Sequence, residues 1–177
     1  MKKYNTRNLI LMALFAALTA VLSQIQLPLG PVPFNLAVLG AFMAGMLLPP
    51  LAASLSMCVY MMLGIIGIPV FAGFVGGPAI LFGKTGGYVL GYIAIAFCTA
   101  LAMQKSGKII VVVCGMLFGL LLCYALGTLW FMIFTGMSLM QSLTFCVIPF
   151  IIPDFAKGVC AWLLGKTLQS RLPEAVK

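Results

Sequence analysis

Long apolar stretches follow one another along nearly the whole sequence, and they leave few choices of fold. Hydrophobic residues make up 64% of the 177 residues and charged residues only 7%, whereas about a quarter of the residues in soluble domains are charged. A water-soluble domain of this length could not hide so much apolar surface. Each crossing of a bilayer takes about 20 apolar residues. We therefore expect an all-α membrane protein, with one integral membrane domain over residues 1–177.

Prolines, glycines and basic residues mark the boundaries of six predicted transmembrane helices. Proline removes a backbone donor and restricts the residue before it, so the proline-rich segment 26–34 and the pair at 49 and 50 interrupt the helical pattern. At about 1.5 Å per residue the second helix rises only about 21 Å, so we expect it to begin inside the membrane or to be extended by its flanks. The six predicted helices cover residues 8–24, 35–48, 51–66, 88–103, 109–134 and 150–169.

The segment from Ile68 to Gly87 is the least helical part of the sequence. It contains two prolines and a repeated G-x-x-G-G pattern at 73–77 and 83–87. Glycine lets backbone N–H groups approach a ligand closely, and a tight re-entrant turn explains the pattern equally well. We expect an ordered outer loop between helices 3 and 4 that forms a binding wall where it dips between helices.

The basic residues predict the topology, because cytoplasmic loops carry an excess of Lys and Arg. With the N-terminus inside, Lys84 lies in an outer loop and Lys157 lies within a helix. The non-helical segments 26–34, 68–87 and 135–149 then lie together on the outer face, which predicts a pocket that opens outward. The other basic residues all fall on the cytoplasmic side, with both termini: Lys2, Lys3, Arg7, Lys105, Lys108, Lys166, Arg171 and Lys177.

Asp154 is the only acidic residue before the C-terminal tail, and Lys157 follows it by three positions. That spacing places both side chains on one face of a helix. A charge at the centre of a transmembrane helix costs about 2.5–3.5 kcal/mol on insertion scales. The pair is interpreted either as a mutual ion pair or as a binding site, and the two interpretations are compatible.

Several classes of function are poorly supported. The segment Gly83-Lys84-Thr85 lacks the earlier glycine of a phosphate-binding loop, because Pro78 stands there, and no further acidic residue is present to hold magnesium. The chain has no histidine and no carboxylate pair for acid–base catalysis. We therefore expect no enzyme activity and no cofactor or metal. The net charge of +8 is scattered, which argues against nucleic acid as a partner.

Two further groups of residues have more than one interpretation. Helix 1 carries small residues at a spacing of four, which let another helix approach closely, either within this chain or in a partner: Ala13 with Ala17, and Ala16 with Ala20. The second group is aromatic and either lines a pocket or forms belts at the membrane interfaces: Tyr88, Tyr92, Tyr124, Trp130 and Trp162.

Four motifs together resemble the signatures of the BioY family, in order and over nearly the whole chain. They are GPVPF at 30–34, GIPVFAGFVGGP at 67–78, GKTGGY at 83–88 and PFIIPDFAK at 149–157. The resemblance implies a six-helix substrate-binding (S) component of an energy-coupling-factor (ECF) transporter in a bacterial cell membrane, with biotin as the transported ligand. It also implies partners, namely a transmembrane coupling protein, which contacts the alanine-rich face of helix 1, and two ATPase subunits.

The resemblance further implies roles for individual residues. Asp154 accepts hydrogen bonds from the ureido N–H groups of biotin, while Lys157 donates either to the ureido carbonyl or to the carboxylate. Lys84 is the alternative partner of the carboxylate. The apolar ring and chain of biotin are expected to lie against Phe71, Tyr88, Tyr92 and Trp130, and the predicted site also includes Gly73 and Asn35, which stands where a threonine is expected. An S component for another small vitamin and a non-transport membrane scaffold are the two alternatives.

Overall fold

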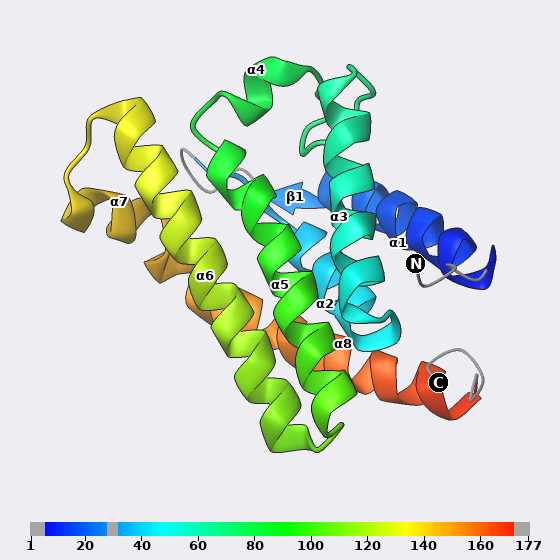
Figure 1. Ribbon diagram of the computed structural model, residues 1–177. Helices are drawn as coiled ribbons and strands as arrows, with labels where there is room; N and C mark the ends of the chain where they lie inside the picture. Colours follow the sequence, from blue (N-terminus) through cyan, green and yellow to red (C-terminus); the bar gives the residue numbers. More distant parts are fainter. Residues whose placement is uncertain (1–5, 28–31, 172–177) are drawn as a thin grey trace.

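The computed structural model describes residues 6–27 and 32–171, and this part of the chain is mostly helical (Figure 1). Gly30, Pro31, Lys2, Lys3 and Lys177 lie outside the described residues. Strands β1 (Gln26–Leu27) and β2 (Phe34–Asn35) form a short antiparallel pair. The helices are α1 (Thr6–Gln24), α2 (Ala37–Leu47), α3 (Pro50–Ile65), α4 (Pro78–Leu81), α5 (Gly86–Lys105), α6 (Ile109–Thr135), α7 (Leu139–Cys146), the 3-10 turn η1 (Ile148–Phe150) and α8 (Ile151–Arg171).

Helices occupy all six predicted ranges, but segments predicted to be non-helical contain short helices as well. In the loop 68–87, the four-residue helix α4 starts at Pro78, a residue suited to a first helical turn. Between α6 and α8, helix α7 starts with a capping box in which Ser138 and Gln141 satisfy each other's backbone N–H groups. Both predictions were therefore too simple, because each short helix starts at a local signal, a proline for α4 and a capping box for α7, rather than in a long apolar run.

Four helical segments are long and apolar enough to cross a membrane: Thr6–Gln24, Gly86–Lys105, Ile109–Thr135 and Leu139–Arg171. The other two predicted spans, α2 and α3, are shorter apolar helices. Of the eleven residues of α2, ten are buried. An apolar helix of this length is typical of a buried or re-entrant segment, and α2 packs against α1, α3, α5 and α8.

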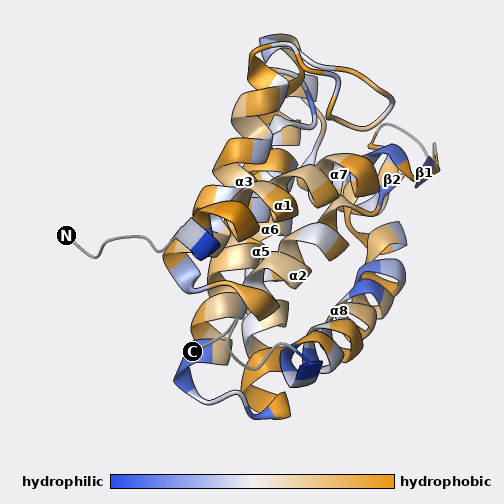
Figure 2. Cartoon of the chain, turned by 90° about the vertical axis from the view of Figure 1, so that its right-hand side faces the viewer, coloured by the Kyte–Doolittle hydropathy of each residue, from blue (hydrophilic) through white to orange (hydrophobic). Residues whose placement is uncertain are grey.

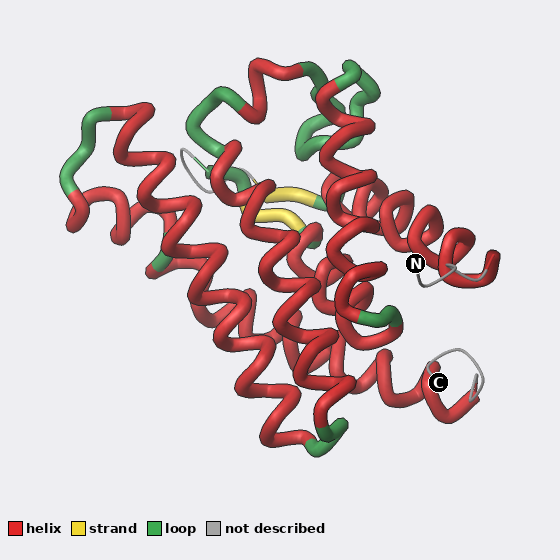
Figure 3. Tube along the Cα trace, viewed as in Figure 1, coloured by secondary structure: helices red, strands yellow, loops and turns green. Residues whose placement is uncertain are grey.

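Helix α5 lies at the centre of the molecule and packs against α2, α3 and α6 (Figure 1). It is also the most buried of the long apolar segments. The loop around α4, the two strands and the α6–α7 connection all lie toward the end of the molecule opposite the α5–α6 turn (Figure 3). Non-helical backbone is thereby concentrated at one end of the bundle.

Hydrophobic residues predominate along the helices (Figure 2), and many of them face outward. Large hydrophobic side chains are strongly exposed, including Ile133, Ile152 and Ile110. Cys114 and Cys160 also lie on this surface, whereas Cys123 and Cys146 are buried. Apolar side chains on the outside suit contact with the hydrocarbon of a bilayer, where polar groups are costly.

Candidate binding site

An ion pair in α8 forms the centre of the site. The Lys157 ammonium lies 2.6 Å from Oδ1 of Asp154, which confirms that the two side chains share a helical face. Asp154 is only 3% exposed and Lys157 only 5% exposed. Charges this deeply buried require both a partner and further hydrogen bonds.

Those further bonds come from two other parts of the chain. The Tyr124 hydroxyl of α6 donates to Oδ2 of Asp154 at 2.7 Å. Lys157 donates to the Asn35 carbonyl of β2 at 2.7 Å, and its ammonium lies 4.0 Å from the centre of the Phe34 ring. The pair thus joins α8, α6 and the β1–β2 hairpin in one polar network.

The network keeps unused hydrogen-bonding capacity. Each Asp154 oxygen receives one hydrogen bond from a described residue, and a carboxylate oxygen can accept more than one. The Lys157 ammonium has three donors, of which two are directed to Asp154 and Asn35. A ligand at this point would find an acceptor and a donor side by side.

Two cavities lead away from the pair. A small one of about 40 Å³ lies directly against Asp154, Lys157 and Tyr124. A larger one of about 210 Å³ extends to Tyr60, Phe71 and Lys84. The two cavities are neighbours, because they share Val32, Pro33, Asn35, Tyr88 and Tyr92 as walls. Asp154 and Lys157 line the smaller cavity, and Lys84 lines the larger one.

Two glycines leave room for aromatic side chains that line the cavities. The Phe71 ring lies so close to Gly64 of α3 that any Cβ there would overlap it. The Tyr88 ring occupies the corresponding space beside Gly127 of α6. Phe71 also meets Tyr60 edge to face, with ring centroids 5.6 Å apart, an arrangement that aromatic pairs favour.

Side chains of α1 and α6 hold the loop over the larger cavity. Ser23 donates to the Val70 carbonyl at 2.5 Å. Gln24 donates to the Phe71 carbonyl at 3.2 Å and accepts from the Phe74 N–H at 2.8 Å. On the other side, Trp130 of α6 donates to the Gly83 carbonyl at 2.9 Å. These bonds satisfy loop backbone groups that would otherwise need water.

Most of the predicted site residues come together, and two lie elsewhere. Gly73 is exposed and its backbone has a φ of +85° beside Gln26. Trp130 supports the loop and does not line either cavity. The cavities are lined by the remaining predicted residues: Asn35, Phe71, Lys84, Tyr88, Tyr92, Asp154 and Lys157.

Sequence reasoning missed Tyr60 and left Tyr124 undecided between a pocket and a membrane belt. Tyr124 lies a little past the middle of the apolar helix α6, with nothing in the sequence to single it out, and its bond to Asp154 depends on the packing of two helices. Only the requirement that a buried carboxylate find more than one donor pointed to such a residue.

The four alanines of α1 divide between two faces. Ala13 and Ala17 are exposed, whereas Ala16 is buried and Ala20 packs partly buried against the core. Ala16 and Ala20 therefore serve packing within this chain. Ala13 and Ala17 leave a shallow, accessible stripe on the outside of the bundle.

Comparison with known proteins identifies the family. The family profile of BioY matches residues 1–174. The chain belongs to the BioY family. It is 40% identical to the "Probable biotin transporter BioY" of Pyrococcus horikoshii, over 90% of this chain and 94% of that protein. It is 36% identical to the "Biotin transporter BioY" of Thermotoga maritima, over 92% of this chain and 96% of that protein.

A solved structure shares the fold. It is described as the S-component for biotin from an ECF-type ABC transporter, and it matches with a TM-score of 0.88 over 100% of this chain and 99% of that one. Sequence identity is 24%. The helical arrangement described above is therefore the fold of that S-component.

The ion pair yields a first prediction. Lys157→Met keeps a long side chain but leaves the Asp154 carboxylate buried without its cation, so we expect a loss of about 3–5 kcal/mol in the free energy of unfolding. The double variant Asp154→Asn with Lys157→Met removes both charges and should recover most of that loss. Unfolding of the three proteins in detergent measures both effects, and a single variant as stable as the wild type would contradict the burial of the pair.

Proposed function

We propose that this chain is the biotin-binding S component of an ECF-type uptake transporter, which captures biotin with high affinity for import driven by partner ATPases. The observation that carries the proposal is the buried Asp154–Lys157 network at the inner end of an aromatic cavity. The names of the BioY relatives support the ligand and favour transport over catalysis.

The ureido ring of biotin suits the inner end of the site. The ring offers two N–H donors and one carbonyl acceptor. The network offers carboxylate acceptors on Asp154 and one donor on Lys157. The free acceptor positions of Asp154 take the ureido N–H groups, and the remaining donor of Lys157 takes the ureido carbonyl. Hydrogen bonds to charged groups contribute about 1.5–3 kcal/mol each, so this contact would decide both affinity and orientation.

The carboxylate of biotin is then assigned to Lys84. Lys157 is committed to Asp154 and Asn35 at the inner end, whereas Lys84 lines the far part of the larger cavity. A ligand that spans both cavities places its ureido ring and its carboxylate at opposite ends. The apolar ring and chain would lie between them, against Phe71, Tyr88 and Tyr92.

The distribution of charge supports the orientation in the membrane. Among the described residues, Arg7, Lys105, Lys108, Lys166 and Arg171 lie at helix ends or turns remote from the loop around α4. By the positive-inside rule that end is cytoplasmic. The pocket then faces outward, both termini are cytoplasmic, and one domain over residues 1–177 crosses the membrane six times, with α2 and α3 completed by their flanks.

Import needs partners, because the sequence contains no nucleotide-binding motif. A transmembrane coupling protein and two ATPase subunits would supply the energy. The exposed pair Ala13 and Ala17 is the proposed contact with the coupling protein, since small residues at a spacing of four let two helices approach closely. Ala16 and Ala20 are assigned to packing within the chain.

Binding of biotin to the purified protein in detergent tests the function directly. Calorimetry should show tight binding to the wild type, and Asp154→Asn should weaken it tenfold or more, because a hydrogen bond to a charged group is lost. Lys157→Ala should behave alike, and thiamine and riboflavin serve as control ligands. If thiamine or riboflavin binds and biotin does not, the protein is an S component for another vitamin. If none of the three ligands stabilises the protein, the non-transport scaffold is the better interpretation.

The assignment of Lys84 has its own test. Lys84→Gln should weaken the binding of biotin by tenfold or more, since it removes a charged hydrogen-bond partner. The same substitution should change the affinity for the amide of biotin, which lacks the carboxylate charge, by much less. If Lys84→Gln affects acid and amide equally, or neither, the carboxylate is bound elsewhere and Lys157 becomes the candidate.

Assembly provides the test of the α1 surface. Ala13→Leu with Ala17→Leu puts two large side chains on the exposed stripe and should reduce co-purification with the coupling protein and ATPases while biotin binding in isolation is kept. The matched control is Leu14→Ala, which alters an exposed position one residue along the same helix. Undiminished assembly of the double variant would place the contact on another face.

A further inference from the structure

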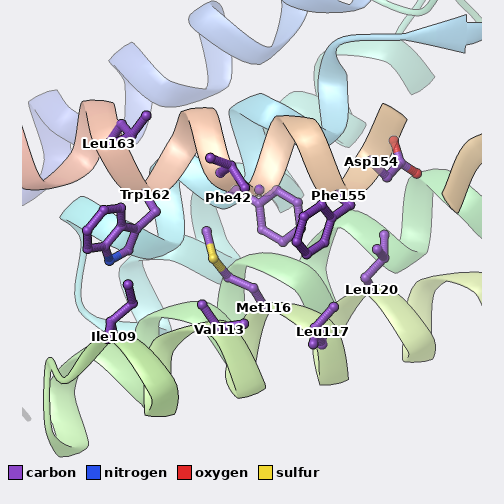
Figure 4. A pocket seen from close by; sticks show the side chains of 12 residues that line it. Phe42, Ile109, Val113, Met116, Leu117, Leu120, Asp154, Phe155, Trp162 and Leu163 are labelled. Atoms are coloured by element: carbon purple, nitrogen blue, oxygen red, sulfur yellow. The ribbon is translucent and has the colours of Figure 1, made fainter. Parts of the chain in front are cut away.

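A third cavity, which shares Leu120 and Asp154 with the small cavity of the proposed biotin site, opens on the outside of the bundle between α6 and α8 (Figure 4). Its volume is about 230 Å³. α2 contributes the fully buried Phe42, while several lining residues from α6 and α8 are half exposed or more. The lining residues are Phe42, Ile109, Val113, Met116, Leu117, Leu120, Asp154, Phe155, Gly158, Val159, Trp162 and Leu163.

The groove is apolar along almost its whole length. Its polar side chains are Asp154 at one end and Trp162 toward the other (Figure 4). Both oxygens of Asp154 are already bonded, to Lys157 and Tyr124, so an apolar occupant does not leave that carboxylate without partners. Such a surface matches a hydrocarbon chain.

The Trp162 end of the groove carries an unsatisfied donor. The indole Nε1 of Trp162 is buried and has no hydrogen-bond partner among the described residues, and it is turned toward Ile109 at the start of α6 (Figure 4). Buried polar groups are nearly always paired. The nitrogen is covered in this structure, so it would gain a partner from the groove only when the indole turns toward an acceptor on the occupant.

Basic residues lie at the same end. Lys166 follows Trp162 by four positions, which places both on one face of α8, and its ammonium donates to the Gly107 carbonyl in the α5–α6 turn at 3.3 Å. Lys108 immediately precedes Ile109, a lining residue of the groove. Two cations therefore flank the point where the apolar groove ends.

From this combination we propose that the groove between α6 and α8 binds an anionic phospholipid. One acyl chain lies along the apolar lining toward Asp154, and the phosphate lies near Lys166 and Lys108, while an ester carbonyl accepts from Trp162 once the indole has turned toward the groove. Basic sites between transmembrane helices suit the headgroups of anionic lipids.

Native mass spectrometry of the full chain with added lipid tests the proposal. The wild type should retain phosphatidylglycerol in preference to phosphatidylcholine. Lys166→Gln should lower the retention of phosphatidylglycerol about fivefold, the effect expected of one cation near an anionic lipid surface. Lys84→Gln removes the same charge at the opposite end of the molecule and should leave lipid retention unchanged.

A second variant fills the groove without touching its charges. At Gly158 an added Cβ would meet only Phe42, at an ordinary contact distance of 3.8 Å, so Gly158→Leu can be accommodated and its side chain extends toward the groove. It should lower retention of phosphatidylglycerol severalfold while the melting temperature in detergent is kept. Equal retention of the two lipids by the wild type overturns the proposal, as does undiminished phosphatidylglycerol retention by a folded Gly158→Leu variant.

Discussion

The structure depends on the buried ion pair between Asp154 and Lys157, because Asp154 is the only acidic residue in the described part of the chain. The sequence contains only two acidic residues, and one of them, Asp154, is enclosed with Lys157 inside an apolar bundle. Removing two charges from water costs more than their attraction returns unless additional hydrogen bonds complete the geometry. Tyr124 and the Asn35 carbonyl provide those bonds, so α6, α8 and the β1–β2 hairpin have to meet at one point.

The positions of the β1–β2 hairpin, helix α2 and the cavity are all related to the Asp154–Lys157 pair. For the Asn35 carbonyl to reach Lys157, the hairpin has to enter the bundle, and α2 begins two residues later with Asn35 accepting from the Ala37 N–H. α2 ends at Leu47, just before the proline pair at 49 and 50, and it lies almost wholly buried among α1, α3, α5 and α8. The cavity occupies the space left above the pair, where the loop 66–85 closes over it and is held by Ser23, Gln24 and Trp130.

Sequence reasoning succeeded where the physical cause is local. Prolines and apolar runs located the four long helical segments and the two shorter helices α2 and α3, and a spacing of three gave the Asp154–Lys157 pair. It failed where the cause is a contact between distant segments: the bond of Tyr124 to Asp154 joins two helices, and Trp130 reaches a loop 47 residues away rather than the pocket. The short helices α4 and α7 were missed because a first-turn proline and a capping box, not hydrophobic periodicity, mark where they start.

Asp154 also lies between the proposed biotin site and the outer groove proposed to bind lipid. Its side chain lines both the small inner cavity and the outer groove between α6 and α8, so a single helix separates the proposed biotin site from the lipid phase at this level. An acyl chain in the groove would exclude water from the outer side of α8 and keep the surroundings of the pair apolar. Hydrogen bonds to a charged group are stronger in such surroundings. The membrane itself would then strengthen the proposed hydrogen bonds between the ion pair and biotin.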